Sequence, residues 1–196
     1  MKKDIILAGV GGQGILSIAA TIGTAALNSG LYLKQAEVHG MSQRGGDVQS
    51  NLRISDKEIA SDLIPVGKAD LIISVEPMES LRYLPMLSPN GWLITNTKPF
   101  INIGNYPTMD ELMNEIESFE NHIALDADEI AKDLGSPKSA NMVILGAACP
   151  FLGIPYSDIQ DAIRSIFSRK GEEVVETNLN ALKAGYETAS EKLQTA

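Results

Sequence analysis

Cysteine is almost absent from this sequence, since Cys149 is the only one in 196 residues. A lone cysteine excludes an internal disulfide, and without a Cys-x-x-Cys pattern the chain lacks the thiolates that usually hold an iron–sulfur cluster. His39 and His122 lie far apart in the sequence with no cysteine pair, so a zinc site is not expected. Cys149 itself lies in an apolar segment and is expected to be a core residue.

Long apolar runs and an excess of basic residues are also absent. No unbroken apolar run reaches the roughly 18 residues that span a membrane, and the apolar run after Lys3 is too short for a secretory signal. The expected location is therefore the cytoplasm. The net charge is −9, and residues 101–196 carry seven Lys/Arg against sixteen Asp/Glu. Nucleic-acid binding usually needs a basic face, so neither a nucleic-acid nor a membrane partner is expected, and the acidic half is interpreted as solvated helix faces.

What the chain does have is a glycine-rich turn near its start. Residues 5–8 are apolar and suit a short strand, residues 15–27 are apolar over a length that suits a helix, and four glycines occupy positions 9, 11, 12 and 14 between them. In such a strand-to-helix turn Gly9 permits the bend, Gly11 permits close approach of the backbone to a ligand, and Gly14 permits close helix–sheet contact. The first amides of the helix favour an anion there.

Strands and helices alternate along the rest of the chain. Residues 31–38, 48–54, 70–75, 92–97 and 122–125 are expected to be strands, and a short return strand is expected at 58–60. Helices are expected at 78–87, 108–120, 127–134, 139–152, 157–167 and 173–194, with capping boxes at Thr108 and Ser157. This pattern predicts one domain over residues 1–196: an α/β, three-layer, Rossmann-like fold with a mostly parallel sheet and an added hairpin near residues 47–60.

Two interpretations of the glycine turn follow from the residues alone. Glu37 lies 23 residues after Gly14, about where a dinucleotide-binding fold places its ribose-binding acid, which favours a free-standing NAD(P)-dependent dehydrogenase. The polar loop His39–Gly46 instead resembles a second anion cradle, in which Arg44 supplies a guanidinium and Gly45 and Gly46 supply backbone amides. A nucleotide-sensing module without catalytic activity would use the same glycines.

Two segments together carry a family resemblance. The sequences GVGGQGI at 9–15 and AEVHGMSQRGGDVQSNLRIS at 36–55 resemble the gamma-type domain of 2-oxoacid:ferredoxin oxidoreductases, and most closely the small subunits that act on indolepyruvate. The resemblance continues through ADLIISVEP at 69–77, NGWLITNT at 90–97 and SANMVILGA at 139–147.

The resemblance implies a reaction and a distribution of the cofactors between subunits. An aryl pyruvate and coenzyme A would yield the acyl-CoA and carbon dioxide, with electrons passed to ferredoxin. Thiamine diphosphate, magnesium and iron–sulfur clusters would belong to a larger alpha subunit, so this chain would be an accessory subunit, inactive alone, with no tightly bound cofactor of its own. No residue of this chain would be catalytic, and no metal site is expected on it.

The residues expected to contact the coenzyme A phosphates or the partner subunit come from the two glycine loops. They are Gly9, Gly11, Gly12, Gln13 and Gly14 in the first, and Glu37, His39, Gln43, Arg44, Gly45 and Gly46 in and before the second. Arg44 is the leading candidate, because a guanidinium grips phosphate through two hydrogen bonds. In this interpretation Glu37 holds Arg44 in place instead of binding ribose.

Overall fold

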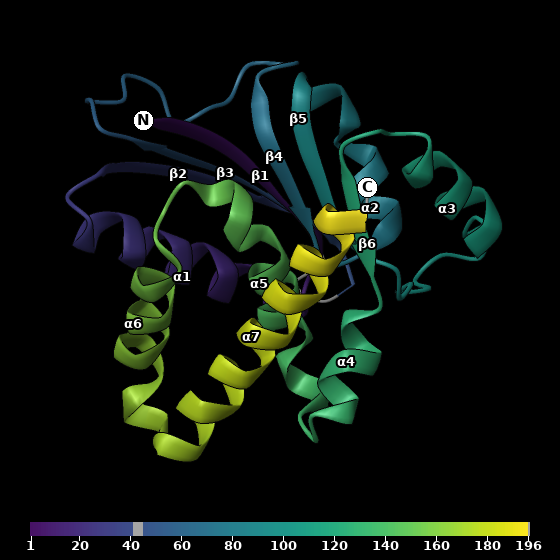
Figure 1. Ribbon diagram of the computed structural model, residues 1–196. Helices are drawn as coiled ribbons and strands as arrows, with labels where there is room; N and C mark the ends of the chain where they lie inside the picture. Colours follow the sequence, from purple (N-terminus) through teal and green to yellow (C-terminus); the bar gives the residue numbers. More distant parts are fainter. Residues whose placement is uncertain (41–44, 196) are drawn as a thin grey trace.

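The computed structural model describes residues 1–40 and 45–195, and a six-stranded sheet forms its centre. The strands are β1 Lys2–Val10, β2 Tyr32–His39, β3 Asp47–Ser55, β4 Ala69–Ser74, β5 Leu87–Asn96 and β6 His122–Leu125. They lie in the order β2-β3-β1-β4-β5-β6 (Figure 1). Neighbouring strands from β1 to β6 pair in parallel, whereas β3 is antiparallel to both β1 and β2.

The helices cover both faces of this sheet. They are α1 Ile15–Asn28, α2 Pro77–Arg82, α3 Met109–Glu117, α4 Ala127–Asp133, α5 Ala140–Leu152, α6 Tyr156–Phe167 and α7 Glu172–Thr195, with short 3-10 turns at Leu84–Met86, Pro137–Ser139 and Ser168–Lys170. Helices α1, α5, α6 and α7 pack on one face, and α2 and α3 pack on the other (Figure 1). The prediction of a three-layer α/β fold is confirmed.

The central strands are apolar along their whole length because both of their faces are buried. Side chains alternate between the two faces of a strand, so Ile5 and Ile73 point into the core under α5, whereas Ile6 and Ile72 point toward α2 and α3. All four side chains are at most 1% exposed. A parallel sheet covered on both sides produces this continuous apolar pattern, and the prediction of a mostly parallel sheet is confirmed.

The antiparallel strands do not lie where the hairpin near residues 47–60 was expected. Residues 58–60 form no strand, so the return strand expected there is wrong. The antiparallel pair is instead β2 and β3, in register from Tyr32 opposite Ser55 to His39 opposite Val48. Because β3 lies between β2 and β1, it is largely buried along its length.

Several predicted helix ends are confirmed and one is wrong. Thr108 caps α3 with the expected box, since its hydroxyl accepts from the Glu111 amide and the Glu111 carboxylate accepts from the Thr108 amide. Helix α6, in contrast, begins at Tyr156 directly after Pro155, so Ser157 lies inside the first turn and caps nothing. Proline fixes a backbone angle suited to a helix start, and the N-cap is therefore Pro155, two residues before the expected Ser157.

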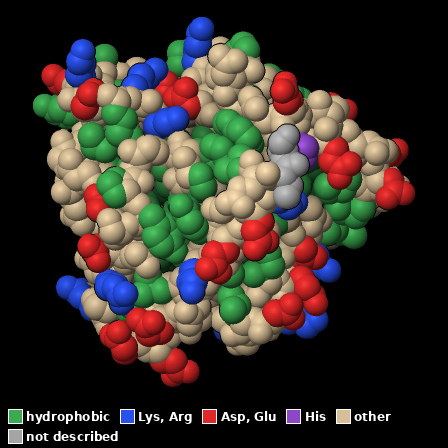
Figure 2. Space-filling view, viewed as in Figure 1, with side chains coloured by type: hydrophobic (Ala, Val, Ile, Leu, Met, Phe, Trp, Pro, Cys, Tyr) green, Lys and Arg blue, Asp and Glu red, His purple; other side chains and the backbone are tan. Residues whose placement is uncertain are grey.

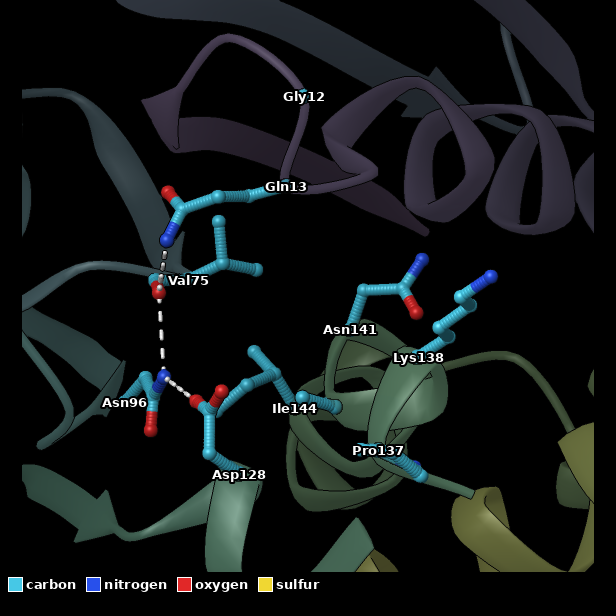
Figure 3. Close-up of a pocket in the computed structure, with 10 residues that line it drawn as sticks. Gly12, Gln13, Val75, Asn96, Asp128, Pro137, Lys138, Asn141 and Ile144 are labelled. Carbon is cyan, nitrogen blue, oxygen red and sulfur yellow. Dashed lines mark hydrogen bonds between the residues drawn. The ribbon is translucent and has the colours of Figure 1, made fainter. Parts of the chain in front are cut away.

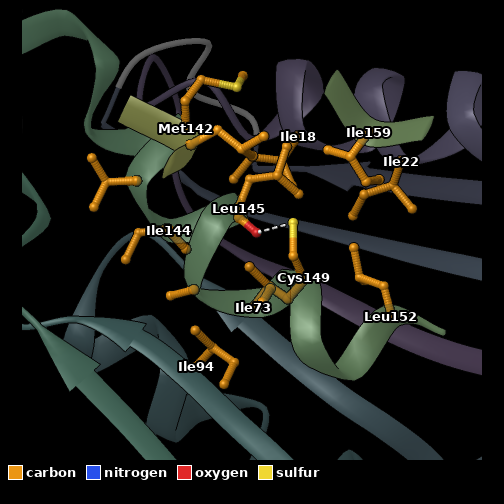
Figure 4. Close-up of a cluster of buried hydrophobic side chains, with 14 of the residues drawn as sticks. Ile18, Ile22, Ile73, Ile94, Met142, Ile144, Leu145, Cys149, Leu152 and Ile159 are labelled. Carbon is orange, nitrogen blue, oxygen red and sulfur yellow. Dashed lines mark hydrogen bonds between the residues drawn. The ribbon is translucent and has the colours of Figure 1, made fainter. Parts of the chain in front are cut away.

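Helix α5 is the core element of the larger layer. Its residues 142–149 are all buried, and Figure 4 shows side chains of α5, among them Leu145 and Cys149, packed with side chains of α1, α6 and the sheet. The thiol of Cys149 donates to the Leu145 carbonyl at 3.3 Å within this core, as expected for a structural cysteine. Burial raises the pKa of this thiol to about 12.

The acidic second half of the chain forms solvated helix faces, as expected. The carboxylates Asp110, Glu111, Glu115 and Glu117 of α3 are exposed while Leu112 and Ile116 of the same helix are buried. On the face that α6 and α7 cover, Asp and Glu side chains lie at the surface among Lys and Arg (Figure 2). Among the described residues, no helix is long and apolar enough to cross a membrane.

Candidate functional site

The glycine turn lies between β1 and α1, at the carboxyl ends of the parallel strands. Gly14 precedes the first helical residue, Ile15, with a φ of 84°, and Gly12 has a φ of 102°. Both angles lie in the left-handed region that favours glycine. The strand–turn–helix arrangement predicted from the sequence is therefore confirmed.

Close packing also explains two of these glycines. A Cβ on Gly9 would lie 2.4 Å from Val75 Cγ2 and 2.8 Å from Ile15 Cδ1, so Gly9 lets β1, β4 and α1 meet. A Cβ on Gly14 would lie 2.5 Å from Nδ2 of Asn141, and that amide donates to the Gly14 carbonyl at 3.2 Å. Gly14 thus serves contact between α1 and α5, and the expected helix–sheet role is corrected to a helix–helix one.

Gln13 holds the turn in its conformation. Its Oε1 accepts from the Val10 amide at 2.8 Å, and its Nε2 donates to the Val75 carbonyl at 3.4 Å. The side chain therefore ties the turn to the ends of β1 and β4. This gives Gln13 a structural task in addition to lining the cavities described below.

The second glycine segment lies directly against the first. The Gly11 amide donates to the Gly46 carbonyl at 2.9 Å, and the Gly45 amide donates to the Gly11 carbonyl at 3.5 Å. Asn102 Nδ2 donates to the Gly45 carbonyl at 2.7 Å. Gly45 and Gly46 of the second anion cradle therefore lie beside the first glycine turn. The predictions for Gln43, Arg44 and the side chain of His39 fall outside the described residues.

A third segment, residues 97–107, is anchored beside these bends. The buried carboxylate of Glu76 accepts from the Glu79 amide at 2.7 Å, from the Phe100 amide at 3.2 Å and from the Tyr106 hydroxyl. Burial, together with the hydrogen bond to Glu76, raises the pKa of Tyr106, so this hydroxyl stays a donor. Glu76 therefore positions the segment from which Asn102 reaches Gly45.

Glu37 lies away from the glycine turn. It belongs to β2, opposite Ser50 of β3, and its Oε2 accepts from Gln35 Nε2 at 3.4 Å. Since β3 separates β2 from β1, the strand that carries Glu37 runs about 10 Å from the strand that leads into the turn. A dinucleotide-binding fold instead places the second strand beside the first, so this sheet order removes the geometry that a ribose-binding role of Glu37 needs.

In the described part of the chain, several backbone amides around the turn have no hydrogen-bond acceptor. Within residues 1–40 and 45–195, the backbone N–H groups of Gly12, Gly14, Ile15 and Leu16 have no hydrogen-bond acceptor. Orphan amides and the positive end of the helix dipole favour an anion at the start of a helix. The Gly11 amide is not part of this set, because Gly46 occupies it.

Two cavities open on the α5 side of the turn. The first has a volume of about 420 Å³ and lies between the ends of β4 and β5 and the starts of α4 and α5 (Figure 3). The second, of about 570 Å³, lies between the turn and α7. Both are lined by Gly12, Gln13, Lys138 and Asn141, so they meet at the glycine turn.

Polar side chains that the sequence analysis did not single out line the first cavity. Asn96 Nδ2 donates to the Val75 carbonyl at 3.2 Å and to Asp128 Oδ2 at 2.7 Å (Figure 3). Lys138 and Asn141 lie on the opposite wall. One signal for two of them was in the sequence: Asn96 is the second-last residue of an expected strand, Asp128 lies three residues after another, and ligands of α/β sheets bind at such ends.

A smaller, more apolar cavity lies on the other side of the turn. Its volume is about 280 Å³, and it is lined by Val10, Gly11, Gly12, Gly14, Ile15, Leu16 and Val48. No group of three or more His, Cys, Asp or Glu side chains with the spacing of a metal site occurs among the described residues. The polar groups that line these cavities are thus amides, hydroxyls, two carboxylates (Asp128 and Glu173) and two lysines (Lys138 and Lys170).

Comparison with known proteins identifies the family. The profile of the pyruvate ferredoxin/flavodoxin oxidoreductase family matches residues 4–188. The indolepyruvate oxidoreductase subunit IorB of Archaeoglobus fulgidus is 38% identical over 198 aligned residues, which cover 96% of each chain.

Solved structures have the same fold. The gamma subunit of a keto/oxoacid ferredoxin oxidoreductase from Geobacter sulfurreducens has a TM-score of 0.70 and 26% identity, covering 96% of this chain and 99% of that one. A 2-oxoglutarate:ferredoxin oxidoreductase from Magnetococcus marinus, with 2-oxoglutarate, coenzyme A and succinyl-CoA bound, has a TM-score of 0.77 and 24% identity. The match covers 97% of this chain but 31% of that longer one, and at this identity it shows the fold. With its family profile, full-length relative and fold in agreement, this chain belongs to the pyruvate ferredoxin/flavodoxin oxidoreductase family.

Proposed function

We propose that this chain is the small subunit of a 2-oxoacid:ferredoxin oxidoreductase that acts on indolepyruvate or another aryl pyruvate. The observation that carries the proposal is the 38% identity to an indolepyruvate oxidoreductase subunit over nearly the full length of both chains. In the reaction, the bond between the carboxylate and the oxo carbon breaks to release carbon dioxide. The acyl group passes to the coenzyme A thiol, and the electrons pass to ferredoxin.

The proposal assigns the redox cofactors to a larger partner. Thiamine diphosphate, magnesium and iron–sulfur clusters would be held by the alpha subunit, and this chain would be inactive alone. The single cysteine supports that assignment, because it is buried and has its pKa raised to about 12, whereas a cluster needs several thiolates. The complex would act in the cytoplasm, where ferredoxin would reach it through the larger subunit.

The two glycine bends would contact the coenzyme A phosphates or the partner subunit. Among the described residues the amides of Gly12 and Gly14 have no acceptor, which supports a phosphate contact, and the hydrogen bond from Gly11 to Gly46 holds the second bend beside the first. Gln13 and Gly9 would maintain the shape of the turn. His39, Gln43 and Arg44 would extend the site from the second bend, with the Arg44 guanidinium on a phosphate.

Reconstitution with the larger subunit tests the function. We expect the complex to reduce a viologen dye only when indolepyruvate and coenzyme A are both present, and the purified chain alone to show no such activity. Reduction of NAD by the isolated chain with a hydroxy acid would contradict the proposal. Tight nucleotide binding without any association with a thiamine-dependent subunit would favour a sensing module instead.

A single substitution tests the phosphate contact. In the reconstituted complex, Arg44→Ala is expected to raise the apparent KM for coenzyme A about tenfold or more, because a charge-assisted hydrogen bond is lost, and to leave the KM for indolepyruvate unchanged. The matched control is Arg164→Ala, which removes an exposed arginine of α6 that pairs with Glu176. An unchanged KM for coenzyme A in Arg44→Ala would remove Arg44 from the site.

A further inference from the structure

Asn96 is a buried amide whose orientation is fixed by its neighbours. It is 3% exposed, its Nδ2 donates to the Val75 carbonyl and to Asp128, and its Oδ1 accepts from the amides of Lys98 at 3.3 Å and Ala127 at 3.0 Å. Turning the amide over would place NH₂ against two N–H donors and oxygen against two acceptors. Asn96 therefore presents a donor to Asp128 and holds that carboxylate in one position.

Asp128 has unused acceptor capacity directed at the cavity. It is half-buried, lines the 420 Å³ cavity and accepts one hydrogen bond, from Asn96 at 2.7 Å. A carboxylate has about four lone-pair positions, and within the described part of the chain no lysine, arginine or histidine pairs with this one. A bound molecule that offers hydroxyl or amino donors would satisfy the remaining positions.

The cavity has opposite chemical character at its two ends. Asp128 and Asn96 form one wall, and Lys138 and Asn141 lie across from them (Figure 3), while Gly12 of the turn also lines the cavity. Beyond the glycine turn the second cavity adds Lys170, Ser17 and the Gly14 amide, together with the carboxylate of Glu173 beside Lys170. A matching ligand carries phosphate toward the turn and lysines, and neutral hydrogen-bond donors toward Asp128. A nucleotide has this division, because its ribose hydroxyls and base amino group lie apart from its phosphates.

We propose that Asp128, positioned by Asn96, recognises the nucleoside part of coenzyme A by accepting hydrogen bonds from its ribose hydroxyls or adenine amino group. This inference rests on the proposed function, since it takes the glycine bends to hold the phosphates of the same molecule. It extends that proposal to Asn96 at the end of β5 and Asp128 in the first turn of α4. Asp128 would also disfavour simple anions in this half of the cavity, because like charges repel.

The test separates the two halves of coenzyme A. Binding of adenosine 3′,5′-bisphosphate and of 4′-phosphopantetheine to the full chain is measured by titration calorimetry, for the wild type, Asp128→Asn and Glu129→Gln. Asp128→Asn keeps the size of the side chain and an oxygen for Asn96 but lacks the charge. Glu129→Gln removes a neighbouring carboxylate that is exposed and pairs with Lys132, so it controls for net charge and for the first turn of α4.

We expect Asp128→Asn to weaken binding of the bisphosphate about tenfold or more, since hydrogen bonds to a charged acceptor are lost, and to leave 4′-phosphopantetheine binding unchanged or slightly tighter. Glu129→Gln should leave both affinities near the wild-type values. If Asp128→Asn bound the bisphosphate as well as or better than the wild type, the role of Asp128 would be contradicted. That result would leave the proposed coenzyme A site itself unaffected. If the wild type bound neither compound, the coenzyme A role of this chain would fail as well.

Discussion

Two glycines with the same kind of backbone angle have different surroundings, and this predicts different costs of substitution. Gly30 has a φ of 72° with open space where a Cβ would lie, whereas at Gly14, with a φ of 84°, the Cβ would lie 2.5 Å from Asn141. Gly30→Ala is expected to cost about 1 kcal/mol of unfolding free energy through backbone strain alone. Gly14→Ala should cost roughly 1–2 kcal/mol more, because it also displaces Asn141. Urea unfolding measures both, and equal losses would contradict the packing role of Gly14.

The buried thiol of Cys149 predicts low reactivity and a pH dependence. Because burial raises its pKa to about 12, the thiolate fraction at pH 8 is on the order of one in ten thousand. The native chain should not react with Ellman's reagent within minutes, whereas the chain unfolded in urea should react at once. Above pH 9 the unfolded thiol loses its proton while the native one keeps it, so the unfolding free energy should fall as the pH rises. Fast modification of the native chain would contradict the burial.

At the scale of elements, α5 and α7 cross at two glycines where their backbones approach closely. A Cβ on Gly185 would lie 1.9 Å from the Val143 carbonyl oxygen, and a Cβ on Gly146 would lie 2.0 Å from that of Leu182. Backbone atoms cannot move aside as a side chain can, so Gly185→Ala is expected to cost about 3 kcal/mol or more of unfolding free energy.

Gly23→Ala in α1 is the matched control for this crossing. Its Cβ would lie 3.0 Å from a terminal methyl group of Leu33, and alanine favours the helix by about 1 kcal/mol, so the net change should be within about 1 kcal/mol. Thermal or urea unfolding compares the two variants. A Gly185→Ala protein as stable as Gly23→Ala would show that the helices do not pack through these glycines.

At the scale of the whole molecule, one sheet joins both hydrophobic layers, which predicts a single cooperative unfolding transition. Trp92, the only tryptophan, lies on β5 and packs against Phe151 of α5 with ring centroids 4.4 Å apart. Its fluorescence therefore reports on contact between sheet and helix. Fluorescence and far-ultraviolet circular dichroism should give coincident urea transitions. Two separated transitions would contradict a single domain over residues 1–196, which remains a prediction.

Local patterns predicted most elements because their causes are local. The capping box at Thr108 and the apolar strand before Ser74 each follow from neighbouring residues, and both are present. The expected strand at 58–60 and the cap at Ser157 failed where a competing signal decided: β2 supplied the antiparallel partner, and Pro155 set the helix start. The glycine turn was also predicted from neighbouring residues, as the capping box was.

The sequence by itself determined the layered α/β fold, the glycine turn and the family, because hydrophobic period, glycine spacing and short motifs are properties of contiguous residues. Only the tertiary structure decided which strands are neighbours. The insertion of antiparallel β3 beside β1 carried Glu37 away from the turn and brought Gly46 against Gly11. The same packing placed Asn96 of β5 and Asp128 of α4, which are 32 residues apart in the sequence, together beside that turn. Strand order depends on contacts between residues that are far apart in the sequence, and no local pattern encodes it.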